Sequence, residues 1–136
     1  PKPIAQAINA LQSHSTSNAT SFAQKGAVAA LTGPQTHLEE WLTEFNKRRT
    51  YAAERLNNMS GISCVNSRGA FYLFPNIEGT GLTSAEFCDR LLVHSKVAAV
   101  PGIAFGADNN FRISHATSME NIQKGMDRLD AFCKSL

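Results

Sequence analysis

The chain has 136 residues, 43% of them hydrophobic and 18% charged, which suits one globular core and is too short for two large ones. Its 13 basic and 11 acidic residues give a formal net charge of +2, too small for a general affinity for nucleic acid or an anionic membrane. The three cysteines form no CxxC pair and the four histidines have no metal-ligand spacing with them, which predicts reduced thiols, a cytoplasmic protein and no metal site. No apolar run reaches the roughly 18 residues of a membrane span, so we expect none.

Two short helices are expected at the start of the chain. Apolar residues at helical spacing follow Pro3, which suits a first helical turn, and a polar run over 13–21 ends this helix. A second, alanine-rich helix begins at Ser21 and ends at Gly33-Pro34. Both helices have apolar faces but no strand to cover, so we expect them to pack against a surface outside this chain.

The longest predicted helix comes next and leads into two strands. Thr36 and Glu39 form a capping-box pair, and apolar residues then hold one face of a helix until Ser60-Gly61. Segments 62–66 and 70–74 are separated by a turn-like "SRG", which predicts that they pair as antiparallel strands.

The remaining segments continue the alternation of helices and strands. Thr83 and Glu86 form a second capping box for a helix over 83–95, and short strands are expected at 97–101 and 111–116. A third capping box, Thr117 with Glu120, precedes the last helix. The order after residue 35 is therefore α-β-β-α-β-β-α, which predicts an open sheet covered by helices, an α/β fold of the α+β sandwich kind.

Arg112 is the leading candidate for a binding residue because it interrupts an apolar strand. Strand alternation separates two sets of side chains, with Phe111, Ile113 and His115 on one face and Arg112, Ser114 and Ala116 on the other. A guanidinium keeps its charge and offers a planar set of donors that suits a carboxylate. The alternative is an arginine on a solvated sheet face. The glycines of the preceding "PGIAFG" allow close approach of a ligand, although a plain connecting turn explains them equally well.

Other patterns carry weaker signals. Phe71 in "GAFYLF" is either a core residue or part of a site, and "SHSTSN" offers donors for a phosphate or substrate, or simply a helix cap and a loop. The "GTGLTS" stretch lacks the lysine and the preceding strand of a phosphate-binding loop. The "KRR" at 47–49 points in different directions around a helix, which favours a solvated face. No nucleophile with a partnering base can be assembled.

Several separated motifs together resemble one family over essentially the whole chain. These are "SHSTSNATSFAQKGAVAAL", "SRGAFYLFPNI", "VAAVPGIAFG" and "FRISHATSMENIQKGMDRL". They resemble the C-terminal third of class I aspartate aminotransferases, which use pyridoxal 5'-phosphate. The resemblance implies a fold type I enzyme, a homodimer with active sites between subunits, and transfer of an amino group between aspartate and 2-oxoglutarate.

The resemblance also implies roles for individual residues. Arg112 in "FRIS" matches the arginine that grips the substrate α-carboxylate, and Phe71 in "GAFY" matches an aromatic residue near that carboxylate. Thr16, Ser17 and Asn18 match a loop that approaches the cofactor pocket of the neighbouring subunit. Residues 1–34 match a helical tail of the large cofactor-binding domain, and residues 35–136 match the small C-terminal domain with a long bridging helix.

The chain also departs from the family pattern. The family's Schiff-base lysine, its phosphate-binding arginine and the aspartate that pairs with the pyridine nitrogen match positions upstream of Pro1, and neither Lys2 nor Lys25 takes the lysine's place. We therefore expect this polypeptide alone to be inert and to bind no cofactor. We also expect it to self-associate through its first 33 residues.

Alternatives to an aspartate aminotransferase stay open. The "STSN" loop lacks the arginine that the animal-type subgroup uses for the distal carboxylate, so aspartate specificity is not secured. Another fold type I enzyme, such as an aromatic or alanine aminotransferase or a carbon-sulfur lyase, uses the same carboxylate grip. A non-catalytic α/β domain that binds a carboxylate metabolite is the alternative from a different class.

Overall fold

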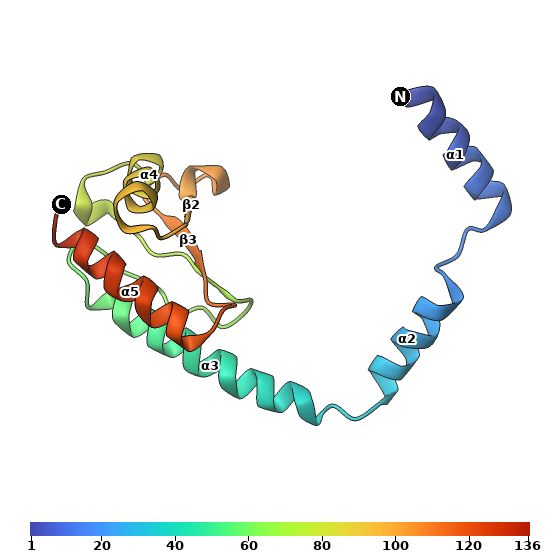
Figure 1. The fold of residues 1–136 in the computed structure, drawn as a ribbon, viewed down its shortest axis with the longest axis horizontal. Helices are drawn as coiled ribbons and strands as arrows, with labels where there is room; N and C mark the ends of the chain where they lie inside the picture. Colours follow the sequence, from blue (N-terminus) through green and yellow to red (C-terminus); the bar gives the residue numbers. More distant parts are fainter. The chain divides into compact units, whose positions relative to one another are not determined.

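The computed structural model describes residues 1–136, which form two compact units, Pro1–His37 and Leu38–Leu136. The first unit holds two of the predicted helices, α1 (Lys2–Ser15) and α2 (Ser21–Thr32), drawn in blue in Figure 1. Pro3 lies in the first turn of α1, where its missing N–H costs nothing. Neither helix buries a single residue. This unit therefore has no core of its own.

The second unit combines three long helices with a small sheet (Figure 1). Helix α3 (Thr36–Asn57) enters this unit at Leu38, and it is followed by the rest of the fold. The later elements are β1 (Tyr72–Leu73), α4 (Ser84–Ser95), β2 (Val100–Pro101), β3 (Phe111–Ser114) and α5 (Met119–Cys133), with short 3-10 helices η1 (Glu78–Thr80) and η2 (Gly102–Phe105). This mixture of helices and an antiparallel sheet confirms the predicted fold class.

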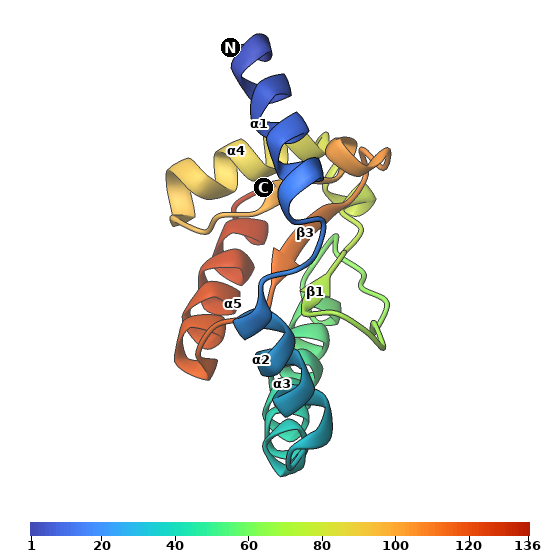
Figure 2. The same cartoon turned by 90° about the vertical axis from the view of Figure 1, so that its right-hand side faces the viewer.

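The sheet has the strand order β1-β3-β2, with both pairs antiparallel. Figure 2 shows β1 beside β3. Tyr72 opposes Ser114 in the first pair, and Val100 opposes Arg112 in the second. The central strand therefore carries Arg112 between two short neighbours.

The predicted hairpin between 62–66 and 70–74 is wrong in its pairing. Segment 70–74 supplies β1, which pairs with β3, while the earlier segment keeps one isolated bridge, Ser63 to Asn76. The cause is the side chain of Asn57 at the end of α3. Its amide accepts from the N–H of Cys64 and donates to the carbonyl of the same residue, each at 2.9 Å. These bonds occupy the backbone groups that a strand ladder would need.

The core of the second unit is built from the inner faces of α3, α4 and α5 and from the sheet. Fully buried side chains include Leu56, Leu73, Phe87, Phe111 and Leu129. The ring of Phe87 packs on that of Phe111 at 5.0 Å between centroids, which joins α4 to β3. Burial also raises the pKa of Cys88 and Cys133 to about 11, so both thiols stay protonated near neutrality.

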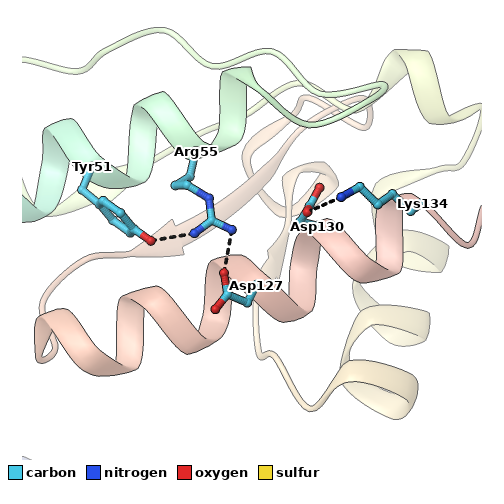
Figure 3. Close-up of polar contacts among 5 residues, drawn as sticks. All are labelled: Tyr51, Arg55, Asp127, Asp130 and Lys134. Carbon is cyan, nitrogen blue, oxygen red and sulfur yellow. Dashed lines mark hydrogen bonds and ion pairs between the residues drawn. The ribbon is translucent and has the colours of Figure 1, made fainter.

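Polar contacts join α3 to α5 at the rim of this core (Figure 3). Arg55 donates to the hydroxyl of Tyr51 on its own helix at 2.6 Å and to the carboxylate of Asp127 on α5 at 2.7 Å. The bond to Asp127 raises the pKa of Arg55 further above its ordinary value. Lys134 pairs with Asp130 one turn earlier on α5. Asp127 and Lys134 are largely exposed, so both ion pairs add little to stability.

Two of the predicted capping boxes can be compared with the helix starts. Thr83 caps α4, and its hydroxyl accepts from the N–H of Glu86 while that carboxylate accepts from the N–H of Thr83, as predicted. The box at α5 is wrong, because Ser118 rather than Thr117 caps the helix and accepts from the N–H of Asn121. No helix of the protein combines the length and apolarity that crossing a membrane requires.

Candidate carboxylate-binding site

Arg112 lies on β3 with the alternation that the sequence predicts. Phe111, Ile113 and His115 are buried, whereas Arg112 is half-buried and Ser114 is exposed. The period of two places the arginine on the open face of the sheet while its neighbours anchor the strand in the core. A cation is tolerated within this apolar segment because its side chain leaves the core.

Two aromatic rings hold the guanidinium of Arg112. Its central carbon lies 4.4 Å from the ring centroid of Tyr72 and 4.6 Å from that of Phe105. Both distances are within the range of cation–π attraction. The guanidinium makes no hydrogen bond and no ion pair with the rest of the protein. Its N–H donors are therefore free. The two rings restrain the position of the guanidinium without accepting hydrogen bonds from it.

Arg112 also lines a hollow of about 180 Å³ between β3, β1 and the segment leading into β2. The remaining lining residues are Tyr72, Ala98, Ala99, Val100, Ile113 and Ser114. None of them is acidic, so the hollow contains no internal counter-ion for the guanidinium. Its small size, together with a fork of free donors, suits the carboxylate of a small molecule.

Phe71 lies next to this site and outside the core. The residue is 44% exposed, which rules against core packing, and its ring contacts that of Tyr72 in a tilted arrangement with 4.8 Å between centroids. The carbonyl of Phe71 accepts from the N–H of His115 at 2.9 Å and from the hydroxyl of Ser114 at 3.3 Å. The residue is thereby tied to the end of β3, close to Arg112.

The "PGIAFG" loop positions Phe105 through its two glycines. Gly106 adopts the left-handed conformation with φ of 79°, which ends η2. A Cβ on Gly102 would lie 2.2 Å from the carbonyl oxygens of both Ala107 and Asn110. Gly102 therefore permits a close approach of the loop to its own backbone. The turn formed in this way places the ring of Phe105 next to the guanidinium of Arg112.

The other predicted site residues lie in the first unit. Thr16, Ser17 and Asn18 are exposed in the loop between α1 and α2. The side chain of Gln12 donates to the carbonyl of Thr16 at 2.9 Å, and Ser17 donates to the carbonyl of Ser13 at 3.2 Å. These bonds extend the end of α1 and leave most donors of the loop free.

Sequence reasoning missed Tyr72 and Phe105 as partners of Arg112. The predicted pairing of 70–74 with 62–66 gives Tyr72 no contact with β3. The correct register, with Tyr72 opposite Ser114, puts the ring beside the arginine. A usable signal was the aromatic residue in each of the two motifs that flank the strand, "GAFY" and "AFG".

Comparison with known proteins places this geometry in a family. The family described as aminotransferase class I and II matches residues 1–129. The aspartate aminotransferase of Geobacillus stearothermophilus is 41% identical over 140 residues, covering 99% of this chain. The solved aspartate aminotransferase of Rhizobium meliloti aligns with 98% of the chain at a TM-score of 0.85 and 36% identity. An alanine aminotransferase from Pyrococcus furiosus covers 84% at a TM-score of 0.80 and 38% identity.

The matches also define how much of each relative this chain represents. It spans 36% of the Geobacillus protein, 36% of the Rhizobium chain and 30% of the Pyrococcus chain. The agreement in sequence and in fold nevertheless extends over nearly all of its residues. The chain therefore belongs to the class I and II aminotransferase family.

Proposed function

We propose that the complete protein is a pyridoxal-phosphate-dependent aminotransferase acting on aspartate and 2-oxoglutarate, and that this chain supplies the arginine that binds the substrate α-carboxylate. The observation that carries the proposal is Arg112, whose guanidinium lies between two rings with every donor free. Relatives named as aspartate aminotransferases support the reaction class and the substrate.

The residues of this chain do not make a site for the cofactor by themselves. None of its lysines lines the hollow at Arg112. Lys96 donates to the carbonyl of Val93, and Lys124 and Lys134 pair with acidic residues one turn away on α5. We therefore assign no cofactor-binding lysine here, and we expect the isolated 136-residue chain to be inactive. Thr16, Ser17 and Asn18 remain candidates for the cofactor pocket of a neighbouring subunit in a homodimer.

The contribution of this chain is to bind and orient the substrate. A carboxylate in the hollow can accept two parallel N–H bonds from Arg112, which fixes both its distance and its plane. The rings of Tyr72 and Phe105 exclude water from two sides of the guanidinium and strengthen the attraction. A substrate held in this way keeps its α-carbon in one orientation, which is the requirement for selective bond cleavage next to a carboxylate.

The domain assignment is part of the same proposal. Residues 1–34 are proposed as a helical tail of a large cofactor-binding domain, and residues 35–136 as a small domain that includes the bridging helix α3. The exposed apolar side chains of α1 and α2 support this assignment, since Leu11, Phe22 and Leu31 are each at least 71% exposed.

Replacing Arg112 in the complete protein tests the proposal. Arg112→Ala should lower kcat/KM by about 100-fold or more, because a bidentate charged contact is lost. Arg112→Lys should recover only part of this, since an ammonium cannot form the planar pair of bonds. Steady-state kinetics with aspartate provide the measurement, and Arg128→Ala, an exposed arginine on α5, is the control. Equal kinetics for the Arg112 and Arg128 variants would contradict the assignment.

A different amino-acid substrate is the second candidate. No second cation lines the hollow, so the hollow itself contains no group for a distal carboxylate. The likeness to an alanine aminotransferase is nearly as strong as that to an aspartate enzyme. Comparing kcat/KM for aspartate, alanine and an aromatic amino acid with the complete protein separates these substrates.

A further inference from the structure

A second hollow lies near the end of β3, where His115 faces away from Arg112. Its volume is about 160 Å³, and we call it the Arg49–Arg68 cavity. Its lining residues are Leu42, Phe45, Asn46, Arg49, Arg68, Gly69, Ala70 and His115. None of them lines the hollow at Arg112, so the two are separate sites on the second unit.

The Arg49–Arg68 cavity carries positive charge that nothing in the protein neutralises. Arg49 donates to the side-chain oxygen of Asn46 at 3.1 and 3.2 Å, to the carbonyl of Ser67 at 3.0 Å and to the side chain of Asn66. All these acceptors are uncharged. Arg68 is exposed and makes no hydrogen bond or ion pair. By contrast, Arg48 on the same helix is paired with Glu44 at 2.9 Å.

His115 adds a buried polar group that lacks a partner. Its residue is 3% exposed, and neither ring nitrogen has a hydrogen-bond partner. Its ring forms an edge-on aromatic pair with Phe45, at 6.1 Å between centroids, which gives neither nitrogen a hydrogen bond. A buried nitrogen without a partner is costly, and such groups in folded proteins usually serve a ligand, an ion or a water. Here the orphaned imidazole borders a cavity that already contains two unneutralised guanidinium groups.

We propose that the Arg49–Arg68 cavity binds a small oxyanion of the phosphate or carboxylate type. Arg49 and Arg68 supply the charge and the donors, and the buried imidazole of His115 borders the cavity. The cavity is well below the roughly 300 Å³ at which pockets for drug-sized ligands begin, so the ligand is an anion of a few heavy atoms. Water alone would satisfy His115 but would leave both positive charges unneutralised.

His115 provides a direct signal for binding. The charged groups that face it are Arg48 and Arg49 from α3, with Arg68 lining the same cavity. Burial first, and then Arg49 and Arg48, lower the pKa of His115. An anion among these groups favours the imidazolium form, so it should raise this pKa. NMR of the histidine side chains in the complete protein reports it, with His14, His37 and His94 as internal references.

The titration uses inorganic phosphate in one arm and succinate in the other, with sodium chloride at matched ionic strength as the blank. We expect the His115 resonances to shift in a saturable way with at least one anion. The anion with the lower dissociation constant identifies the ligand class. Shifts that grow linearly in both arms, or that the blank reproduces, would overturn the proposal. So would a saturable shift that moves all four histidines equally.

Arginine variants test whether the binding is local. Arg68→Gln should raise the dissociation constant of the anion by about ten-fold, because one charge-assisted contact is lost. Arg128→Gln makes the same change in net charge on α5 and should leave the dissociation constant unchanged. Arg68 is exposed and without internal bonds, so its variant should fold even if Arg49→Gln does not. Equal weakening by the Arg68 and Arg128 variants would show a non-local effect and refute the site.

Discussion

Arg112 and His115 lie three residues apart on opposite faces of one extended segment, and their surroundings give them opposite charge behaviour. Arg112 lies against the faces of two rings, whose negative potential favours a cation. His115 is buried beside the cations of α3, which disfavours its charged form. One strand therefore carries a permanent charge outward and a neutral imidazole inward.

The lowered pKa of His115 predicts that stability depends on pH. In the unfolded chain a histidine takes up a proton near pH 6.5, whereas the buried ring resists protonation. The unfolded state then binds more protons, so the contribution of His115 to the free energy of unfolding should be constant above about pH 6.5 and should fall as the pH drops toward the folded pKa. Urea unfolding at a series of pH values without added phosphate measures this slope.

His115→Phe removes the titrating group while keeping an aromatic ring of similar size. This variant should flatten the slope that His115 contributes below about pH 6.5, whereas His94→Gln, at an exposed position on α4, should retain it. An unchanged slope in His115→Phe would mean that the ring is protonated as easily in the folded protein as in the unfolded chain.

The turn that carries Phe105 depends on Gly102. Adding a methyl group there meets two carbonyl oxygens at 2.2 Å, and both belong to backbone that cannot yield cheaply. Gly102→Ala should therefore lower the free energy of unfolding by about 3 kcal/mol and displace Phe105 from Arg112. Chemical denaturation measures the loss.

Gly125 in α5 is the matched control for Gly102. It lies within the helix and a Cβ there meets nothing within 4 Å. Gly125→Ala should raise the free energy of unfolding by about 0.5–1 kcal/mol through helix propensity and reduced freedom of the unfolded chain. If both variants lowered the free energy of unfolding by similar amounts, the loss would come from replacing any glycine and not from the carbonyl contacts at Gly102.

Helices and the positions of three strands were predictable from local signals, but the pairing of the first strand was not. The capping box of Thr83 and Glu86 marks the start of α4 because both partners are close in sequence. Strand pairing depends on distant partners, and Asn57 diverted the backbone of Cys64 from a ladder through a side chain that belongs to a helix. The residue pattern of 62–66 gives no sign that a side chain of a helix competes for these backbone groups.

The candidate site was predictable in part for the same reason. Arg112 stood out because a cation in an apolar strand is a local anomaly. Its partners required the β1–β3 register, which brings together residues 40 positions apart (from Tyr72 to Arg112). The ring nitrogens of His115 lack hydrogen-bond partners in the folded protein, and no sequence pattern predicts this.

At the scale of the whole molecule, all of the buried hydrophobic core belongs to residues 38–136. The first core residue is Ala52 and the last is Cys133, while α1 and α2 bury nothing. The buried core is therefore confined to the second unit, which supplies the free energy of folding. The apolar side chains of the first unit contribute nothing to a core and remain exposed to water.

This division predicts the behaviour of a chain that begins at Leu38. Its free energy of unfolding should stay within about 1 kcal/mol of the 136-residue chain, because no core contact is removed. The longer chain should self-associate as its concentration rises, since Ile8, Phe22 and Leu31 are more than 60% exposed. Analytical ultracentrifugation compares the two. A monomeric long chain, or a shortened chain that fails to fold, would show that the first unit's apolar faces are already used within the molecule.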